Sequence, residues 1–370
     1  MPSDTKTTKT YQEETYIVNT IRLRGVLNTM PDFARDYFRA IEPTTSPKTR
    51  ISYAYDIRLF FQFLIEENPV YKHHSIKDFQ VQDLEAIQPV DIEEYLEYLK
   101  VYDTTDVHTK ETKQVTNSER GLFRKMSALR SFYNYFFKRQ IIQKNPTLFV
   151  DMPKLHDKAI IRLDTDEVAK LLDYVESCGS KLTGQALSYY NKTKERDIAI
   201  ITLLLGTGIR VSELVGLDLS DVDFNNNGVM VTRKGGSQMV VYFGEEEEKA
   251  LRNYLETYRK AVTPLAGYEN ALFLSTQRRR IGVQAVENMV KKYASQITNK
   301  RITPHKLRST YATILSDDNI SMKAISMSLG HYSPDFTKDV YVRQKMEVID
   351  TVSMIGPYMN EVLPPTPPKR

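Results

Sequence analysis

The stretch "KERDIAIITLLLGTGIRVSELVGL" (194–217) decides the fold prediction. Its first part is dense in apolar residues, which is typical of a helix buried inside a domain. Gly206 and Gly208 then interrupt the pattern, because glycine favours helix ends and turns. Arg210 follows directly at this interruption. The stretch therefore predicts a buried helix that ends by presenting an arginine.

The periodicity changes after this helix. "GVMVTRKGGSQMVVYF" (228–243) contains two β-rich runs around Lys234-Gly235-Gly236-Ser237, which predicts a hairpin. Before residues 194–217, one helix is expected to start near Asp164. After the hairpin the pattern becomes helical again. Those later helices are expected at about 245–262, 282–296, 304–317 and 321–328. This half of the chain is expected to be a mixed α/β domain, mostly helical, with a small antiparallel sheet.

The preceding part is expected to be all-helical. In "TSPKTRISYAYDIRLFFQFLIEENP" (45–69), Ser46 can cap a helix and Pro47 suits its first position. Further helices are predicted in "PVDIEEYLEYLKVY" and in "TNSERGLFRKMSALRSFYNYFFKRQ", where Thr116 and Glu119 have capping-box spacing. The polar stretch between these two helices, "DTTDVHTKETKQ", is expected to be a loop.

The length of 370 residues suits two domains. We expect a flexible N-terminal segment, a helical domain, a linker, a second domain and a C-terminal segment with a Pro-rich tail. Their respective boundaries are 1–24, 25–150, 151–160, 161–345 and 346–370.

The bulk composition is that of an intracellular protein. The single cysteine, Cys178, has no partner for an internal disulfide, which fits a reducing compartment. The polar N-terminus lacks the apolar core of a signal peptide, and no apolar run approaches the roughly 20 residues of a membrane span. The net charge of +4 permits a polyanionic partner without requiring one.

Four segments of the second half contain residues that can handle protons or anions. They are "GTGIRVSEL", "TRKGGSQ", "TPHKLRSTYAT" and "LGHYSPDFTKDVYVRQ". Their candidate residues are Arg210, Lys234, His305, Arg308, His331 and Tyr341. Each has a purely structural explanation when taken alone: an arginine paired with Glu213, a solvated turn lysine, a surface helix pair, or a packed tyrosine.

Taken in order, this set resembles the tyrosine site-specific recombinases, which include phage-type integrases and the Xer proteins. The segment "YYNKTKERDIAIITLLLGTGIRVSELVGLDLSDVD" is most similar to the single-enzyme Xer recombinases of Gram-positive bacteria. The helical half resembles the core-type DNA-binding domain of the family through "TRISYAYDIRLFFQFL" and "RKMSALRSFYNYF".

The resemblance implies a role for each candidate residue. Arg210 and Arg308 would hold the charge of the reacting phosphate, because a guanidinium fork matches phosphate oxygens. The two histidines would be further donors, and Glu213 would support the first arginine. Lys234 would protonate the leaving 5′ oxygen, and Tyr341 would attack phosphorus and form a 3′-phosphotyrosine bond. This chemistry needs no metal, ATP or other cofactor.

The sequence departs from the family pattern at two places. His331 and Tyr341 lie ten positions apart, one more than is common in the family, and Ser309 stands where many members have a histidine. Tyr332 is therefore a second candidate nucleophile, although the "DVYVRQ" context favours Tyr341.

The implied partners are double-stranded DNA recombination sites and further copies of this chain, in a tetramer that proceeds through a Holliday junction. Residues 346–370 would dock onto a neighbouring protomer, or would instead pack on their own domain. A DNA translocase or an accessory protein is a further expected partner, and the expected location is the cytoplasm, at the nucleoid. Candidate DNA contacts are Lys48, Arg50, Arg58, Arg124, Lys125, Arg130, Arg278, Arg279, Arg280, Lys291 and Lys292.

The biological role stays open between chromosome dimer resolution, which the Xer-like segment favours, and integration or excision of a mobile element. Two functions outside recombination stay open as well: a DNA-binding regulator without catalysis, and an enzyme that relaxes DNA as type IB topoisomerases do.

Overall fold

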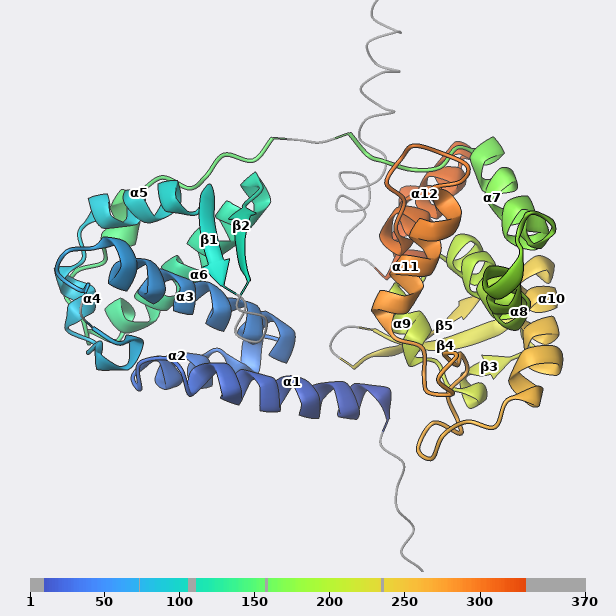
Figure 1. Ribbon diagram of the computed structural model, residues 1–370, viewed down its shortest axis with the longest axis horizontal. Coiled ribbons are helices and arrows are strands. Elements are labelled where there is room, and N and C mark those ends of the chain that lie inside the picture. Colours follow the sequence, from blue (N-terminus) through green and yellow to red (C-terminus); the bar gives the residue numbers. More distant parts are fainter. Residues whose placement is uncertain (1–9, 73, 106–110, 157–158, 234–235, 331–370) are drawn as a thin grey trace, which may run out of the picture. The chain divides into compact units, whose positions relative to one another are not determined.

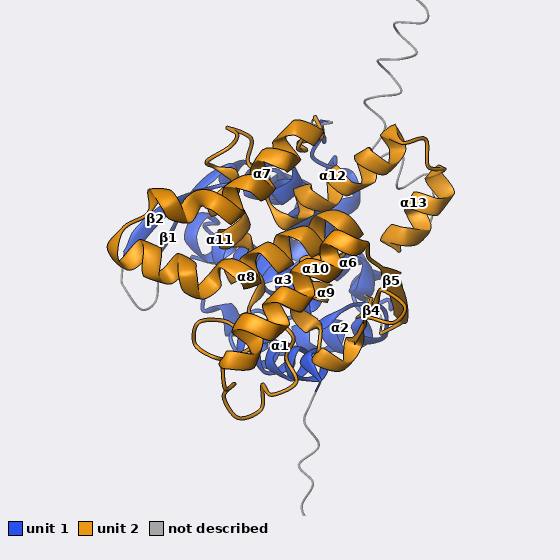
Figure 2. Ribbon diagram, turned by 90° about the vertical axis from the view of Figure 1, so that its right-hand side faces the viewer, with its two compact units in different colours: residues 1–157 blue, residues 158–370 orange. Residues whose placement is uncertain are grey.

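The computed structural model describes residues 10–72, 74–105, 111–156, 159–233 and 236–330. The chain divides into two units, Met1–Asp157 and Lys158–Arg370 (Figure 2). The division falls inside the stretch 151–160. Helices predominate in both units, which confirms the mainly helical fold class. None of the helices that the structure describes has the length and apolarity that crossing a membrane requires.

The first unit consists of six α-helices, three short 3-10 helices and one hairpin in its described residues (Figure 1). The elements are α1 (Tyr11–Leu27), α2 (Ala34–Ala40), η1 (Glu42–Thr44), α3 (Pro47–Glu67), η2 (Ile76–Asp78), α4 (Asp83–Ala86), α5 (Pro89–Tyr98), β1 (Val101–Thr105), β2 (Thr112–Thr116), α6 (Glu119–Lys138) and η3 (Pro146–Phe149).

Helix α3 is central to this unit and starts as the sequence predicts. The Ser46 hydroxyl accepts a hydrogen bond from the Thr49 amide at 3.2 Å, and Pro47 occupies the first helical position. The buried face of α3 packs against α1, α5 and α6. Aromatic side chains fill the space between α3 and α6, where the ring of Phe33 meets those of Phe61 and Phe132.

The hairpin shows that this unit is not entirely helical, and the prediction of a loop is wrong for residues 103–105 and 112–114. Strands β1 and β2 pair antiparallel from Val101 opposite Thr116 to Thr105 opposite Thr112. Their threonines and valines favour extended backbone, but both faces are largely polar and give no hydrophobic alternation to detect. The Tyr102 ring stacks on Tyr98 of α5, with 5.3 Å between the ring centroids.

Two helix starts also differ from the prediction. Residues 11–24 belong to α1, whose Leu23, Val26 and Leu27 are buried, so the expected flexible segment does not extend to residue 24. Helix α6 is capped by Ser118, which accepts from the Gly121 amide, and not by Thr116. The hairpin takes Thr116 into β2 and thereby removes it from the helix end.

The described residues of the second unit form seven α-helices, three other short helices and a three-stranded antiparallel sheet of order β3-β4-β5. The elements are α7 (Thr165–Ser177), η4 (Cys178–Lys181), α8 (Gly184–Thr207), α9 (Val211–Gly216), η5 (Leu219–Asp221), β3 (Val222–Asp223), β4 (Gly228–Thr232), β5 (Gln238–Tyr242), α10 (Glu245–Tyr254), the π-helix η6 (Leu255–Arg259), α11 (Val283–Ala294), α12 (Pro304–Asp317) and α13 (Met322–Leu329).

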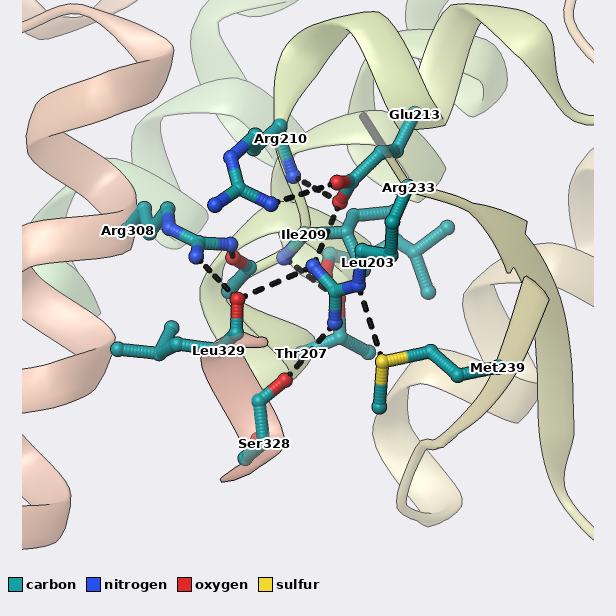
Figure 3. A network of polar contacts seen from close by, with 11 residues as sticks. Leu203, Thr207, Ile209, Arg210, Glu213, Arg233, Met239, Arg308, Ser328 and Leu329 are labelled. Carbon is teal, nitrogen blue, oxygen red and sulfur yellow. Dashed lines mark hydrogen bonds and ion pairs between the residues drawn. The ribbon is translucent and has the colours of Figure 1, made fainter. Parts of the chain in front are cut away.

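Helix α8 is the buried helix that the opening stretch predicts. It packs against α7, α10 and α12 (Figure 1). Strands β4 and β5 form the predicted hairpin, and Val229 and Val231 of β4 point into the core. The C-terminal ends of α8 and α13 and the end of β4 thus come together in one place, where Arg210 and Arg308 lie (Figure 3).

Candidate active site

The turn between α8 and α9 places Arg210. Gly208 ends α8 in the left-handed conformation, with φ of +60°, which glycine adopts without strain. Gly206, expected to break the helix as well, lies inside α8 and touches Glu247 of α10. Gly208 alone therefore makes the break, and Gly206 leaves room for the Glu247 side chain.

Glu213 holds Arg210 by two contacts. Its carboxylate accepts from the Arg210 backbone amide at 2.8 Å and from the Arg210 guanidinium at 2.8 Å. The Glu213 side chain is only 3% exposed, whereas that of Arg210 is 36% exposed. The arginine can thus reach a ligand while its carboxylate partner stays inside the protein.

Arg233 is a second guanidinium on the same carboxylate, at a position not predicted from the sequence. Its Nη1 lies 2.9 Å from Glu213 Oε2 (Figure 3). Arg233 follows β4, and it is buried like Val229 and Val231 of that strand. Since alternate residues of a strand face the same side, this register is the signal that could have identified Arg233 as an inward-pointing cation. Burial lowers the pKa of its guanidinium, and the Glu213 carboxylate opposes this shift.

Arg308 lies on α12, which begins at Pro304 as the sequence predicts. Its side chain is buried, and its guanidinium donates to the carbonyl oxygens of Gly208 and Leu329. The Leu329 carbonyl also accepts from Arg233 Nη1 at 3.2 Å. Arg308 therefore joins the turn that carries Arg210 to the end of α13.

Helix α13 ends beside these arginines. Gly330 adopts φ of +61°, and its amide donates to the carbonyl of Met327. A Cβ atom at Gly330 would lie 2.9 Å from Arg233 Nε. Gly330 is therefore required both for its backbone conformation and for the close approach of Arg233.

His305 lies one turn before Arg308 on α12 and is exposed. Partial loss of hydration lowers the pKa of its imidazole, and the positive charges of Lys306, Arg308 and Arg210 lower it further. The protein thus favours the neutral imidazole more than water does, and a bound phosphate would oppose this effect by favouring protonation.

The structure thus brings together Arg210, Glu213 and Arg308, with His305 close enough to respond to their charges. Lys234, His331 and Tyr341, together with the second candidate nucleophile Tyr332, lie outside the described residues. Three guanidiniums near one carboxylate give this place a net positive charge, which suits an anion such as phosphate.

The candidate DNA contacts separate into two groups. Seven are exposed or partly exposed: Lys48, Arg58, Arg124, Arg278, Arg279, Lys291 and Lys292. The guanidinium of Arg58 lies over the Tyr55 ring. Arg124 is exposed and forms an ion pair with Asp56.

The other four hold the fold together. Arg50 is buried against Glu42 at 2.8 Å, and Lys125 is buried with its ammonium 2.8 Å from Asn117 Oδ1. The expectation that these two are exposed to DNA is wrong, because sequence spacing does not reveal which charges the neighbouring helices cover. The remaining two donate to backbone carbonyls within their own unit: Arg130 and Arg280.

Comparisons with known proteins identify the family of the chain. Residues 161–347 match the phage integrase family. The chain is 33% identical to the tyrosine recombinase XerS of Streptococcus agalactiae serotype III over 335 residues, 84% of this chain and 91% of that protein. It is 32% identical to the tyrosine recombinase XerC of Caldanaerobacter subterraneus subsp. tengcongensis over 315 residues, 82% of this chain and 80% of that protein.

A similar fold occurs in the integrase of transposon Tn1549, solved in complex with a circular intermediate DNA. The TM-score is 0.57 at 20% identity, over 84% of this chain and 97% of that chain. The chain belongs to the phage integrase family. Within it, the chain is a tyrosine recombinase of the Xer type, an enzyme of DNA recombination.

Proposed function

We propose that this recombinase is site-specific and that it cuts and rejoins DNA through a 3′-phosphotyrosine bond at Tyr341. The observation that carries the proposal is the convergence of Arg210 and Arg308 on one turn. Arg308 donates to the carbonyl of Gly208, two positions before Arg210, so the two guanidiniums occupy the same end of α8. Two guanidiniums held at one place suit the two non-bridging oxygens of a phosphodiester.

In the proposed reaction, the phenolic oxygen of Tyr341 attacks phosphorus and the bond to the 5′ oxygen breaks. Lys234 gives its proton to that leaving oxygen, and Arg210 and Arg308 stabilise the extra negative charge of the transition state. His305 and His331 donate hydrogen bonds to the phosphate, and either imidazole can take up the phenolic proton. The new phosphotyrosine bond replaces the broken phosphodiester, so the free 5′ hydroxyl of another strand can reseal the DNA without ATP.

The proposed biological role is that of an Xer recombinase acting on chromosome dimers through a Holliday junction. The relationship to XerS over 91% of that protein supports this role. The first unit would act as the core-type DNA-binding domain, 161–345 as the catalytic domain and 346–370 as the segment that docks a neighbouring copy in a tetramer. If the DNA site that the protein binds lies in a mobile element and not at the chromosomal terminus, the integration and excision role would be favoured.

The recombination site is first identified by selecting the DNA sequences that the protein binds. The mechanism is then tested with a nicked suicide substrate that carries this site. The wild-type protein should form a covalent protein–DNA adduct, and an excess of EDTA should not reduce it. Tyr341→Phe should abolish the adduct, while the matched control Tyr332→Phe should retain it. An adduct that survives Tyr341→Phe and disappears with Tyr332→Phe would transfer the nucleophile to Tyr332, and specific binding without any adduct would support a non-catalytic regulator.

A further inference from the structure

Glu213 contacts two guanidiniums, but the proposed reaction uses only one of them. Arg210 approaches Oε1 at 2.8 Å and Arg233 approaches Oε2 at 2.9 Å. Glu213 and Arg233 are both buried, whereas Arg210 is partly exposed. Arg233 is thus the inner partner of the carboxylate, and Arg210 is the outer one.

The charges of these three groups decide what Arg210 can offer to an anion. Two guanidiniums and one carboxylate carry a net charge of +1. Without Arg233, the carboxylate and Arg210 would form a one-to-one pair with no net charge. Because attraction between charges is stronger where water is excluded, the buried carboxylate would then hold Arg210 and oppose its interaction with phosphate.

Arg233 also fixes the position of α13. Its Nη1 donates to the carbonyl of Leu329 at 3.2 Å and its Nη2 to the carbonyl of Ser328 at 3.0 Å. Arg308 donates to the same Leu329 carbonyl. One guanidinium therefore connects the carboxylate behind Arg210 with the helix end that Arg308 contacts (Figure 3).

We propose that Arg233 is a positioning residue of the recombinase: it neutralises Glu213, so that Arg210 keeps its positive charge for the scissile phosphate, and it holds the end of α13 beside Arg308. The inference rests on the proposed function, in which Arg210 binds that phosphate. It assigns a role in the reaction to a residue that is buried behind Arg210.

The experiment compares cleavage rates on two suicide substrates under single-turnover conditions. One has an ordinary phosphodiester at the cleavage position, and the other has a neutral methylphosphonate, which needs less positive charge for its transition state. Arg233→Met should slow cleavage of the phosphodiester at least about tenfold, which corresponds to about 1.4 kcal/mol. On the methylphosphonate, Arg233→Met should slow cleavage only about threefold or less.

Two further variants separate charge from structure. Adding Glu213→Gln to Arg233→Met removes the unpaired carboxylate and should recover most of the lost rate on the phosphodiester. Arg233→Lys keeps the positive charge and should keep the wild-type ratio between the two substrates. A smaller folded fraction lowers both rates by the same factor, so the ratio does not depend on it. If Arg233→Met does not fold, Arg233→Gln, which retains a donor for the carbonyls, supplies the same ratio.

Equal losses on both substrates, or no recovery in the double variant, would overturn the role of Arg233. The reference variant Arg210→Ala tests the proposed function itself. If Arg210→Ala cleaves the phosphodiester at the wild-type rate, the assignment of Arg210 to the phosphate fails. If Arg210→Ala is defective while Arg233→Met cleaves normally, only the inference about Arg233 fails.

Discussion

Gly208 is a position where one methyl group should disturb both the fold and the candidate active site. Its φ of +60° is unfavourable for any residue with a Cβ atom, which costs about 1–2 kcal/mol. An added Cβ would also overlap with the ring of Tyr311 on α12. The Tyr311 hydroxyl lies 2.8 Å from Ser328 Oγ, and displacement of the ring would break this hydrogen bond, at a further cost of about 1 kcal/mol.

Gly184 provides a matched control at the other end of the same helix. Its φ is +55°, close to that of Gly208, but a Cβ atom there would have no neighbour within 4 Å. Gly184→Ala should therefore show the backbone cost alone, reduced by about 0.4–1 kcal/mol because alanine restricts the unfolded chain. Gly208→Ala should lose about 2 kcal/mol more than Gly184→Ala, since crowding of a packed ring adds to the lost hydrogen bond.

Calorimetric unfolding of the full chain measures this difference. For a unit of this size, about 2 kcal/mol corresponds to a further decrease of about 4–8 °C in the melting temperature of the second unit. The same displacement would move the Gly208 carbonyl away from Arg308, so Gly208→Ala should also slow adduct formation. Equal melting temperatures for the two variants would refute the reasoning, because the contact with Tyr311 would then carry no cost.

Three further outcomes are expected. Lys125→Met should destabilise the first unit by about 2 kcal/mol, because the buried hydrogen bond from the Lys125 ammonium to Asn117 is lost. The control Lys48→Met, on the exposed start of α3, should change the stability measured by calorimetry by less than about 0.5 kcal/mol. Because the pKa of His305 is lowered from 6.5 in the folded protein, the unfolded chain binds more protons just below that pH. Stability should therefore rise with pH through this window, and His305→Gln should flatten the rise in denaturant titrations; an unchanged slope would contradict the shift. Tyr293→Phe removes a 3.0 Å hydrogen bond to the buried carboxylate of Asp197 and should lower the urea midpoint by the equivalent of about 1–2 kcal/mol.

The sequence predicts the helices and strands whose apolar residues recur at a regular spacing. Helix α12 spans Pro304–Asp317 as expected, and β4 and β5 flank the expected turn, because hydrophobic periodicity and glycine positions encode both. The β1–β2 hairpin escapes this reasoning because its strands are polar on both faces. Burial of a charge is also hidden, because the partners of Lys125 and Arg233, Asn117 and Glu213, lie outside the helix or strand run that carries each charge.

The shared acceptor at Leu329 has a consequence for any shortened form of this protein. Its carbonyl oxygen accepts hydrogen bonds from the guanidiniums of Arg233 and Arg308, and Gly330 lies against Arg233. A chain cut after Gly330 would not simply lack the residues that follow. It would carry a terminal carboxylate beside Arg233 and Arg308, and this built-in anion would compete with DNA for the cations. A deletion variant prepared to isolate DNA binding from cleavage should therefore end in an amide or extend further, so that weaker binding is not mistaken for a lost docking surface.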